Sequence, residues 1–95
     1  MTTQDFKNTI NKIIENENST FDSAAKQYCY ENLQEVGRLH SEDIGLEGDD
    51  LARLFKLEDS IVLIIDTYEE DYCFFTSNIE EAQSLATQNL HDFSL

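Results

Sequence analysis

The chain has 95 residues, enough for one domain with a modest core, and 40% of them are hydrophobic, which argues against a disordered chain. It carries 20 acidic residues and six basic ones, so its formal net charge is -14. That balance excludes direct electrostatic binding to nucleic acid and leaves solubility or a basic partner as the reason for the charge. We expect residues 1–95 to form a single acidic domain.

Sequence features that would direct the chain to a membrane or to secretion are not found. The opening, MTTQDFKNTI, lacks a basic region followed by an apolar run. No stretch approaches the 18 or more apolar residues of a membrane span. Cys29 and Cys73 are far apart and are expected to be small core residues. The sequence thus predicts a soluble cytoplasmic protein that has no contact with a membrane.

Two helices are predicted before residue 40. Apolar residues recur at the spacing of one helical face, at Phe6, Ile10, Ile13 and Ile14. They predict a helix from about Thr3 to Asn16, with Thr2 or Thr3 as its N-cap. A second helix is predicted to start after Ser19 or Thr20 and to run to about Val36. Gly37 is its expected stop.

The middle of the chain is rich in β-branched and apolar residues. Residues 61–65 and 72–76 predict a β-hairpin whose charged turn runs from Glu69 to Asp71. Residues 51–57 could form a third antiparallel strand or a short helix capped by Asp49 or Asp50, and the strand is slightly favoured.

A last helix is predicted from Ser77, which makes an S-x-x-E capping box with Glu80, to about Leu90. The expected fold class is therefore α+β: two N-terminal helices, a short antiparallel meander or hairpin, and a C-terminal helix.

Acidic residues gather in three predicted ridges at loops and element ends. The largest lies between Leu39 and Leu51, where Gly45 and Gly48 indicate a shaped loop. The others fall at the hairpin tip and at the start of the last helix, and the turn before residue 61 adds two more acids. The candidate partner-binding residues are Glu42, Asp43, Glu47, Asp49, Asp50, Glu58, Asp59, Glu69, Glu70, Asp71, Glu80 and Glu81. Tyr68 and Tyr72 flank the hairpin acids and are candidate aromatic anchors.

Motifs of catalysis are missing from the sequence. There is no phosphate-binding glycine loop, no C-x-x-C and no H-E-x-x-H. Residues 42–50 do not fit the calcium-binding loop pattern, and His40 is expected to be an ordinary exposed side chain. We therefore expect a protein that is not an enzyme and needs no metal or cofactor.

In size, acidity and acidic loops the chain resembles the small phage-encoded DNA-mimic inhibitors, among them anti-CRISPR proteins of type I systems. The resemblance is one of overall character across the chain. It implies a protein that acts in the cytoplasm of a bacterial host, occupies the basic DNA-binding channel of Cas subunits in a type I surveillance complex, and keeps target DNA out.

Two alternative functions stay open. An immunity protein or antitoxin also uses an acidic surface, in that case to cap one basic nuclease. An acidic housekeeping domain would carry its charge for solubility alone, with no mimicry.

Overall fold

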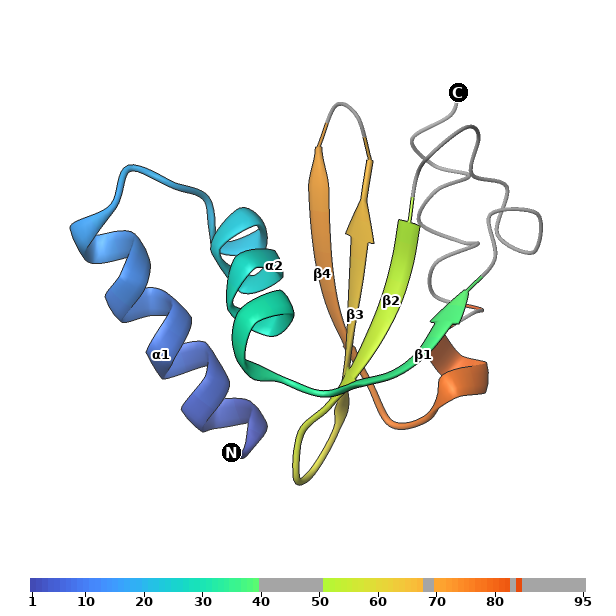
Figure 1. The fold of residues 1–95 in the computed structure, drawn as a ribbon. Helices are drawn as coiled ribbons and strands as arrows, with labels where there is room; N and C mark the ends of the chain where they lie inside the picture. Colours follow the sequence, from blue (N-terminus) through green and yellow to red (C-terminus); the bar gives the residue numbers. More distant parts are fainter. Residues whose placement is uncertain (40–50, 68–69, 83, 85–95) are drawn as a thin grey trace.

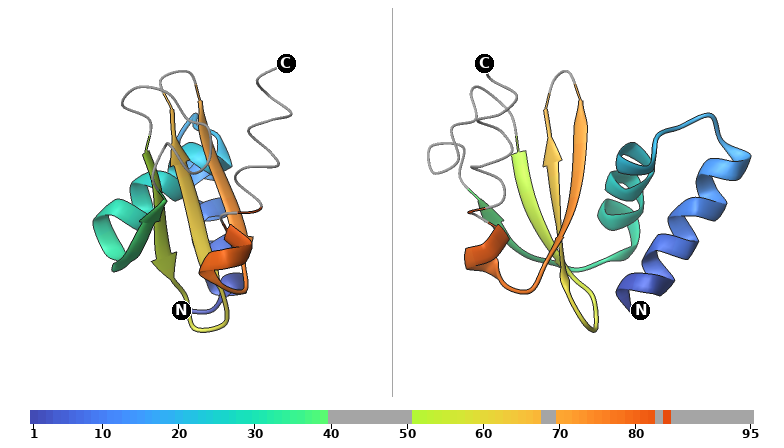
Figure 2. Two further views of the ribbon diagram at one scale, coloured as in Figure 1. Left: turned by 90° about the vertical axis from the view of Figure 1, so that its right-hand side faces the viewer. Right: turned by 180° about the vertical axis from the view of Figure 1, so that it is seen from behind.

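The computed structural model describes residues 1–39, 51–67, 70–82 and 84. Their elements follow the order α1, α2, β1, β2, β3, β4, with a short helical turn at 79–82 after the last strand. Figure 1 shows α1 and α2 on one side of the sheet and the helical turn on the other, and the view from behind in Figure 2 shows the same arrangement. The predicted α+β class is thus confirmed, with one strand more than the sequence suggested.

Helix α1 spans Thr3–Asn16, as predicted. Thr2 is its N-cap: the Thr2 hydroxyl accepts from the backbone N–H of Asp5, and the Asp5 carboxylate accepts from the backbone N–H of Thr2. This reciprocal arrangement satisfies two donors that the first turn would otherwise leave unpaired. Phe6 and Ile10 are its buried residues, so the predicted face is the one that packs.

Helix α2 spans Phe21–Asn32 and is capped by Thr20, one of the two predicted caps. Its predicted extension to Val36 is wrong, because the chain leaves the helix at Leu33 and forms strand β1, Glu35–Leu39. Gly37 therefore lies in a strand and does not end a helix. The register slips between Glu35 and Gly37, so Val36 lies in a bulge, and its side chain is exposed.

Strands β2 (Leu51–Lys56), β3 (Ile61–Asp66) and β4 (Asp71–Thr76) complete an antiparallel sheet of order β1-β2-β3-β4. The slight preference for a strand at residues 51–57 is confirmed, and so is the hairpin. Asp71 belongs to β4, where it faces Asp66 across the ladder, and not to the turn as predicted.

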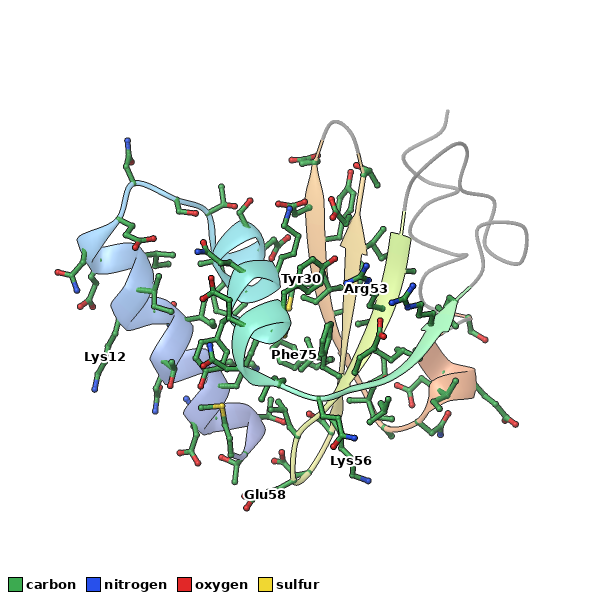
Figure 3. The ribbon with its side chains drawn as sticks, viewed as in Figure 1. Lys12, Tyr30, Arg53, Lys56, Glu58 and Phe75 are labelled. Carbon is green, nitrogen blue, oxygen red and sulfur yellow. The ribbon has the colours of Figure 1, made fainter. Side chains whose placement is uncertain are left out.

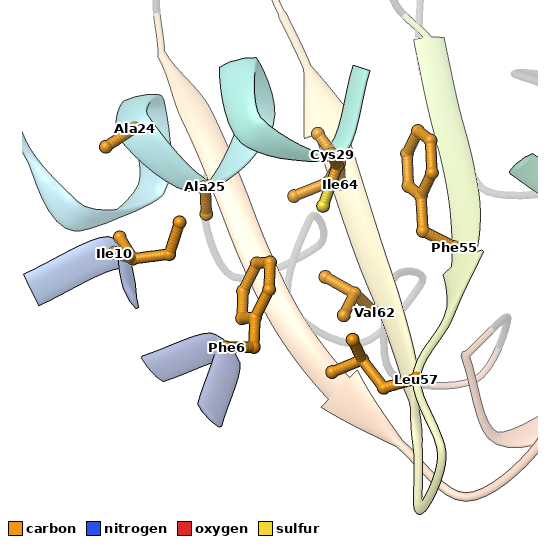
Figure 4. Packing of buried hydrophobic residues seen from close by; sticks show 9 residues of the cluster. All are labelled: Phe6, Ile10, Ala24, Ala25, Cys29, Phe55, Leu57, Val62 and Ile64. Carbon is orange, nitrogen blue, oxygen red and sulfur yellow. The ribbon is translucent and has the colours of Figure 1, made fainter. Parts of the chain in front are cut away.

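Two hydrophobic clusters occupy opposite faces of the sheet, because successive residues of a strand point to opposite sides. The helices cover the first cluster, in which Phe6 meets the rings of Tyr28 and Phe75 edge to face, both at 5.8 Å. Its members are Phe6, Ile10, Ala24, Ala25, Cys29, Phe55, Leu57, Val62 and Ile64 (Figure 4). The second cluster contains Ala52, Leu54, Leu63, Ile65 and Ala82.

Both cysteines are free thiols of the helix-covered side, as expected for core residues. Cys29 is fully buried, and its burial raises the pKa of the thiol to about 12. Cys73 packs against the same cluster.

The helical turn after β4 begins one residue later than predicted. Asn78 is the capping residue, because its side-chain oxygen accepts from the backbone N–H of Glu81. Ser77, the predicted cap, donates its hydroxyl to the Glu81 carboxylate instead. Ala82 is fully buried in the second cluster and holds this turn on the sheet. The rest of the predicted helix lies outside the described residues.

Candidate acidic interaction surface

Six of the twelve predicted contact residues lie in the described part of the chain. They occupy three separate places: Glu58 and Asp59 in the β2–β3 turn, Glu70 and Asp71 at the start of β4, and Glu80 and Glu81 in the helical turn. The two β-turns lie at opposite ends of the sheet (Figure 1), so the structure does not bring these groups into one ridge. The other six, Glu42, Asp43, Glu47, Asp49, Asp50 and Glu69, lie outside the described residues, as do His40 and Tyr68.

Asp59 is tied to the start of α1. Its carboxylate accepts from the backbone N–H and from the hydroxyl of Thr3, both at 2.7 Å. These bonds lower the pKa of Asp59 below its ordinary value, and the bond from the Thr3 hydroxyl has the larger effect. Beside it, the backbone N–H of Glu58 donates to the carbonyl of Met1 at 3.0 Å. The β2–β3 turn therefore serves as a support for the first helical turn.

Asp71 is tied to α2. Its two carboxylate oxygens accept from the Ser23 hydroxyl at 2.9 Å and from Lys26 Nζ at 3.1 Å. Lys26 also lies 3.6 Å from Asp66, the cross-strand neighbour of Asp71. Burial alone would lower the pKa of Lys26, but the hydrogen bond and charge of Asp71, with those of Asp66, raise it above its ordinary value. Lys26 thus stays charged and neutralises this pair of acids in part.

A hollow of about 560 Å³ lies beside this ion pair, between the first turns of α2 and the β3–β4 turn. Asp22 lines it together with Asp66, Glu70 and Asp71. Burial, and then the charges of Glu70 and Asp71, raise the pKa of Asp22, against the lowering effect of the backbone N–H of Cys73. Asp22 is therefore a half-buried carboxylate in a negative environment, next to the outer edge of β4.

A second ionic group lies on β1 and β2, towards the other edge of the sheet, and Tyr30 of α2 packs against it. Glu35 Oε1 lies 2.9 Å from Arg38 Nε and 3.5 Å from Arg53 Nε. The guanidinium of Arg53 lies 4.7 Å from the centre of the Tyr30 ring, and Figure 3 shows the two side chains together between α2 and the sheet. Burial, and then the charge of Asp66, raise the pKa of Tyr30 to about 12.

The described carboxylates therefore fall into two groups. The paired seam comprises the four half-buried acids between α2 and the sheet, Asp22, Glu35, Asp66 and Asp71, and three of these contact a lysine or an arginine. The exposed acids are Asp5, Glu15, Glu17, Glu31, Glu58, Asp59, Glu70, Glu80 and Glu81. In the described residues none of these nine forms an ion pair with a lysine or arginine; Glu58 lies 3.6 Å from the amino group of Met1.

Half of the six basic residues lie in the paired seam. Lys26, Arg38 and Arg53 belong to the paired seam, and Lys7 lies over the ring of Phe75 at 4.9 Å. Lys12 and Lys56 project from α1 and from the end of β2 (Figure 3). The seam was not predictable from the sequence, because Glu35, Asp66 and Asp22 are separated along the chain and only the packing of α2 on the sheet brings them together.

One of the two expected aromatic anchors has a role in the fold. Tyr72 donates its hydroxyl to Glu70, stacks its ring on Phe74 and packs against the second cluster. Tyr30, which the sequence argument did not select, is the more exposed aromatic side chain, at 37%.

Comparisons with known proteins give no assignment: no protein-family model, no curated protein and no solved structure matches the chain. In the described part of the chain, neither helix has the length and apolarity needed to cross a bilayer. Among the same residues, no three His, Cys, Asp or Glu side chains are grouped so as to hold a metal ion.

Proposed function

We propose that this protein is a DNA-mimic inhibitor. It binds the basic DNA-binding groove of a nucleic-acid-handling complex, with a type I CRISPR-Cas surveillance complex as the specific target, and blocks binding of target DNA. Its contact surface consists of the exposed carboxylates predicted to bind a partner, which in the described chain include Glu70, Glu80 and Glu81, and it needs no catalytic residue or cofactor of its own.

The observation that carries this proposal is the separation of the two groups of acids. The lysine and arginines that lie closest to carboxylates are held in the paired seam. The exposed acids of the described chain therefore face solvent without a neutralising lysine or arginine. Within the described residues, most of the surplus negative charge thus lies where a partner can reach it.

A basic groove that binds DNA would attract such a surface. DNA-binding proteins line their grooves with lysine and arginine, which exchange counterions for phosphates. Carboxylates on a folded protein can take the place of those phosphates, and the long-range attraction would accelerate the encounter and make the affinity sensitive to salt.

Capture of the target complex tests the proposal. The tagged chain is immobilised, a purified type I surveillance complex is passed over it, and the capture is repeated with an excess of target duplex. Charge reversals are placed on exposed acids whose carboxylates form no hydrogen bond or ion pair with α1 or α2: Glu80→Lys with Glu81→Lys in one variant, and Glu70→Lys in another. Asp59 and Asp71 are left intact because they stabilise α1 and α2.

A matched control changes the charge by the same amount elsewhere. Glu15→Lys with Glu17→Lys reverses two exposed acids at the end of α1, on the far side of the molecule from the helical turn (Figure 1). We expect target duplex and at least one contact variant to abolish capture, and the control pair to retain it. The proposed target would be refuted if the complex is not captured, or if target duplex does not reduce its capture. A stable one-to-one complex with a basic nuclease would indicate an immunity protein instead.

A further inference from the structure

Both arginines of the chain lie next to each other in the sheet. Arg38 of β1 and Arg53 of β2 are direct cross-strand partners. Like charges directly opposite each other destabilise a sheet. In a chain with 20 acidic residues, the placement of its two arginines side by side therefore calls for a physical explanation.

The two guanidinium groups share one carboxylate. Glu35 Oε1 is 2.9 Å from Arg38 Nε, in hydrogen-bonding geometry, and 3.5 Å from Arg53 Nε. The second contact is an ion pair without a hydrogen bond, and the buried Nε of Arg53 finds no acceptor in the described structure. Among those residues the side chain of Arg53 donates no hydrogen bond. One carboxylate thus faces two guanidinium groups, and the group as a whole keeps a positive charge.

Tyr30 holds the Arg53 guanidinium in a defined orientation. The guanidinium carbon lies 4.7 Å from the centre of the ring, within the range of a cation–π interaction. The Tyr30 hydroxyl is anchored in turn on Asp66 at 3.4 Å. The Arg53 side chain is 26% exposed and that of Arg38 is 54% exposed, so both can be reached from solvent.

We propose that Arg38 and Arg53 form a binding site for a carboxylate group. A guanidinium offers two parallel N–H groups that match the two oxygens of a carboxylate. Arg53 is oriented by Tyr30, its terminal guanidinium nitrogens donate no hydrogen bond within the described residues, and Arg38 adds a second positive charge. The ligand is a free small carboxylate or an acidic side chain of a second copy of this chain, which is rich in such groups. The site is independent of the proposed DNA mimicry.

The surroundings limit the affinity. Glu35 already occupies part of the site, Asp66 lies behind Tyr30, and the net charge of -14 repels anions at long range. We therefore expect a small carboxylate to bind in the millimolar range. Replacement of Glu35 by Gln removes the competing carboxylate and should tighten binding.

Nuclear magnetic resonance of the arginine Nε–H groups tests the site. Acetate is titrated into the labelled protein at constant pH, with chloride at equal ionic strength as the reference. We expect saturable shifts at Arg53 and Arg38, about tenfold weaker binding in Arg53→Lys, which keeps the charge but loses the paired donors, and tighter binding in Glu35→Gln. Lys56→Gln, at the far end of β2, serves as the control and should bind acetate like the parent chain.

The same spectra distinguish the two sources of the carboxylate. Shifts that saturate with acetate at all protein concentrations identify a free ligand. Shifts that grow with protein concentration in the absence of acetate, and that Arg53→Lys abolishes, identify a second copy. Two results would overturn the proposal if neither depends on protein concentration: shifts at Arg38 and Arg53 that are equal in acetate and chloride, or shifts at Arg38 that Arg53→Lys leaves unchanged. Glu35 would then be only a bridge that holds β1 on the sheet.

Discussion

The paired seam and the exposed acids show the same side-chain chemistry in two structural roles. In the seam, Asp71 is bonded to Ser23 and Lys26 and joins α2 to β4. At the surface, Glu15, Glu17 and Glu80 form no ion pair with any described residue. Net charge alone therefore does not locate a contact surface, because part of the negative charge holds the fold together. Only exposed acids that do not also hold an element of the fold, as Asp59 holds α1, are free to bind a partner.

The largest effect on stability is expected at Asp71. Asp71→Ala leaves the charge of Lys26 and the hydroxyl of Ser23 half-buried without their main partner, which should cost about 2 kcal/mol of unfolding free energy. Urea denaturation measures the loss. Glu70→Ala, one residue earlier and exposed, should cost less than about 0.5 kcal/mol. Equal losses in the two variants would contradict the division of the acids into two groups.

A smaller and pH-dependent effect is expected at Asp59, whose side chain is exposed yet bonded to Thr3. The pKa of Asp59 is lowered in the folded state, so its stabilising effect is complete above the ordinary value of 3.8 and is lost as the pH falls through the lowered folded-state pKa. Asp59→Asn should therefore be less stable than the parent chain at neutral pH, and the difference should shrink in acid.

Thermal unfolding between neutral pH and about pH 2 checks this prediction. Glu58→Gln provides the control, because the Glu58 side chain is 68% exposed and its carboxylate accepts no hydrogen bond from Thr3. A stability difference between Asp59→Asn and the parent chain that does not change with pH would show that the carboxylate has no specific role at the helix end.

Removal of the charge at Asp22 is expected to raise stability, which is opposite in sign to the effect at Asp59. Its pKa is raised, chiefly by burial, so ionisation costs stability as the pH rises from the ordinary value of 3.8 through the higher folded-state pKa. Asp22→Asn keeps an oxygen that can accept from the backbone N–H of Cys73 and removes the charge. We expect it to be more stable than the parent chain at neutral pH and equal to it in acid, as measured by chemical denaturation at several pH values. A loss of stability at neutral pH would contradict this account.

The smallest effect on stability is expected at the exposed acids. Each Glu→Lys exchange at positions 80 and 81, or at 15 and 17, should change the unfolding free energy by no more than about 0.5 kcal/mol. Urea denaturation of both pairs checks that they are folded before any binding is measured. A large loss in the 80 and 81 pair would place Glu81 among the structural acids, through its contact with Ser77.

Local patterns predicted much of the fold. The apolar spacing in α1, the Thr2 and Thr20 caps and the β-branched run of β3 each depend on neighbours in the sequence. Strand β1 was not predictable in the same way. The helical pattern of α2 runs on through Leu33 to Val36, and only pairing with β2 draws the chain from Glu35 onward into the sheet.

The candidate site was predictable only in part. Charge density indicated acidic turns, but it could not show that Asp59 and Asp71 are bound to helices 56 and 48 residues away in sequence. The arginine pair was also hidden, because Arg38 and Arg53 become neighbours only through the β1–β2 register. Long-range contacts of this kind are set by topology, which no single local pattern encodes.

The salt dependence of binding to the surveillance complex, measured together with displacement by target duplex, tests the central claim most directly. Affinity of the purified chain is determined by fluorescence anisotropy at several salt concentrations. If exposed carboxylates replace DNA phosphates, affinity should fall steeply as salt rises, and target duplex should displace the chain in a competitive manner. An affinity that does not change with salt, or a complex that binds the chain and target duplex at the same time, would contradict the account.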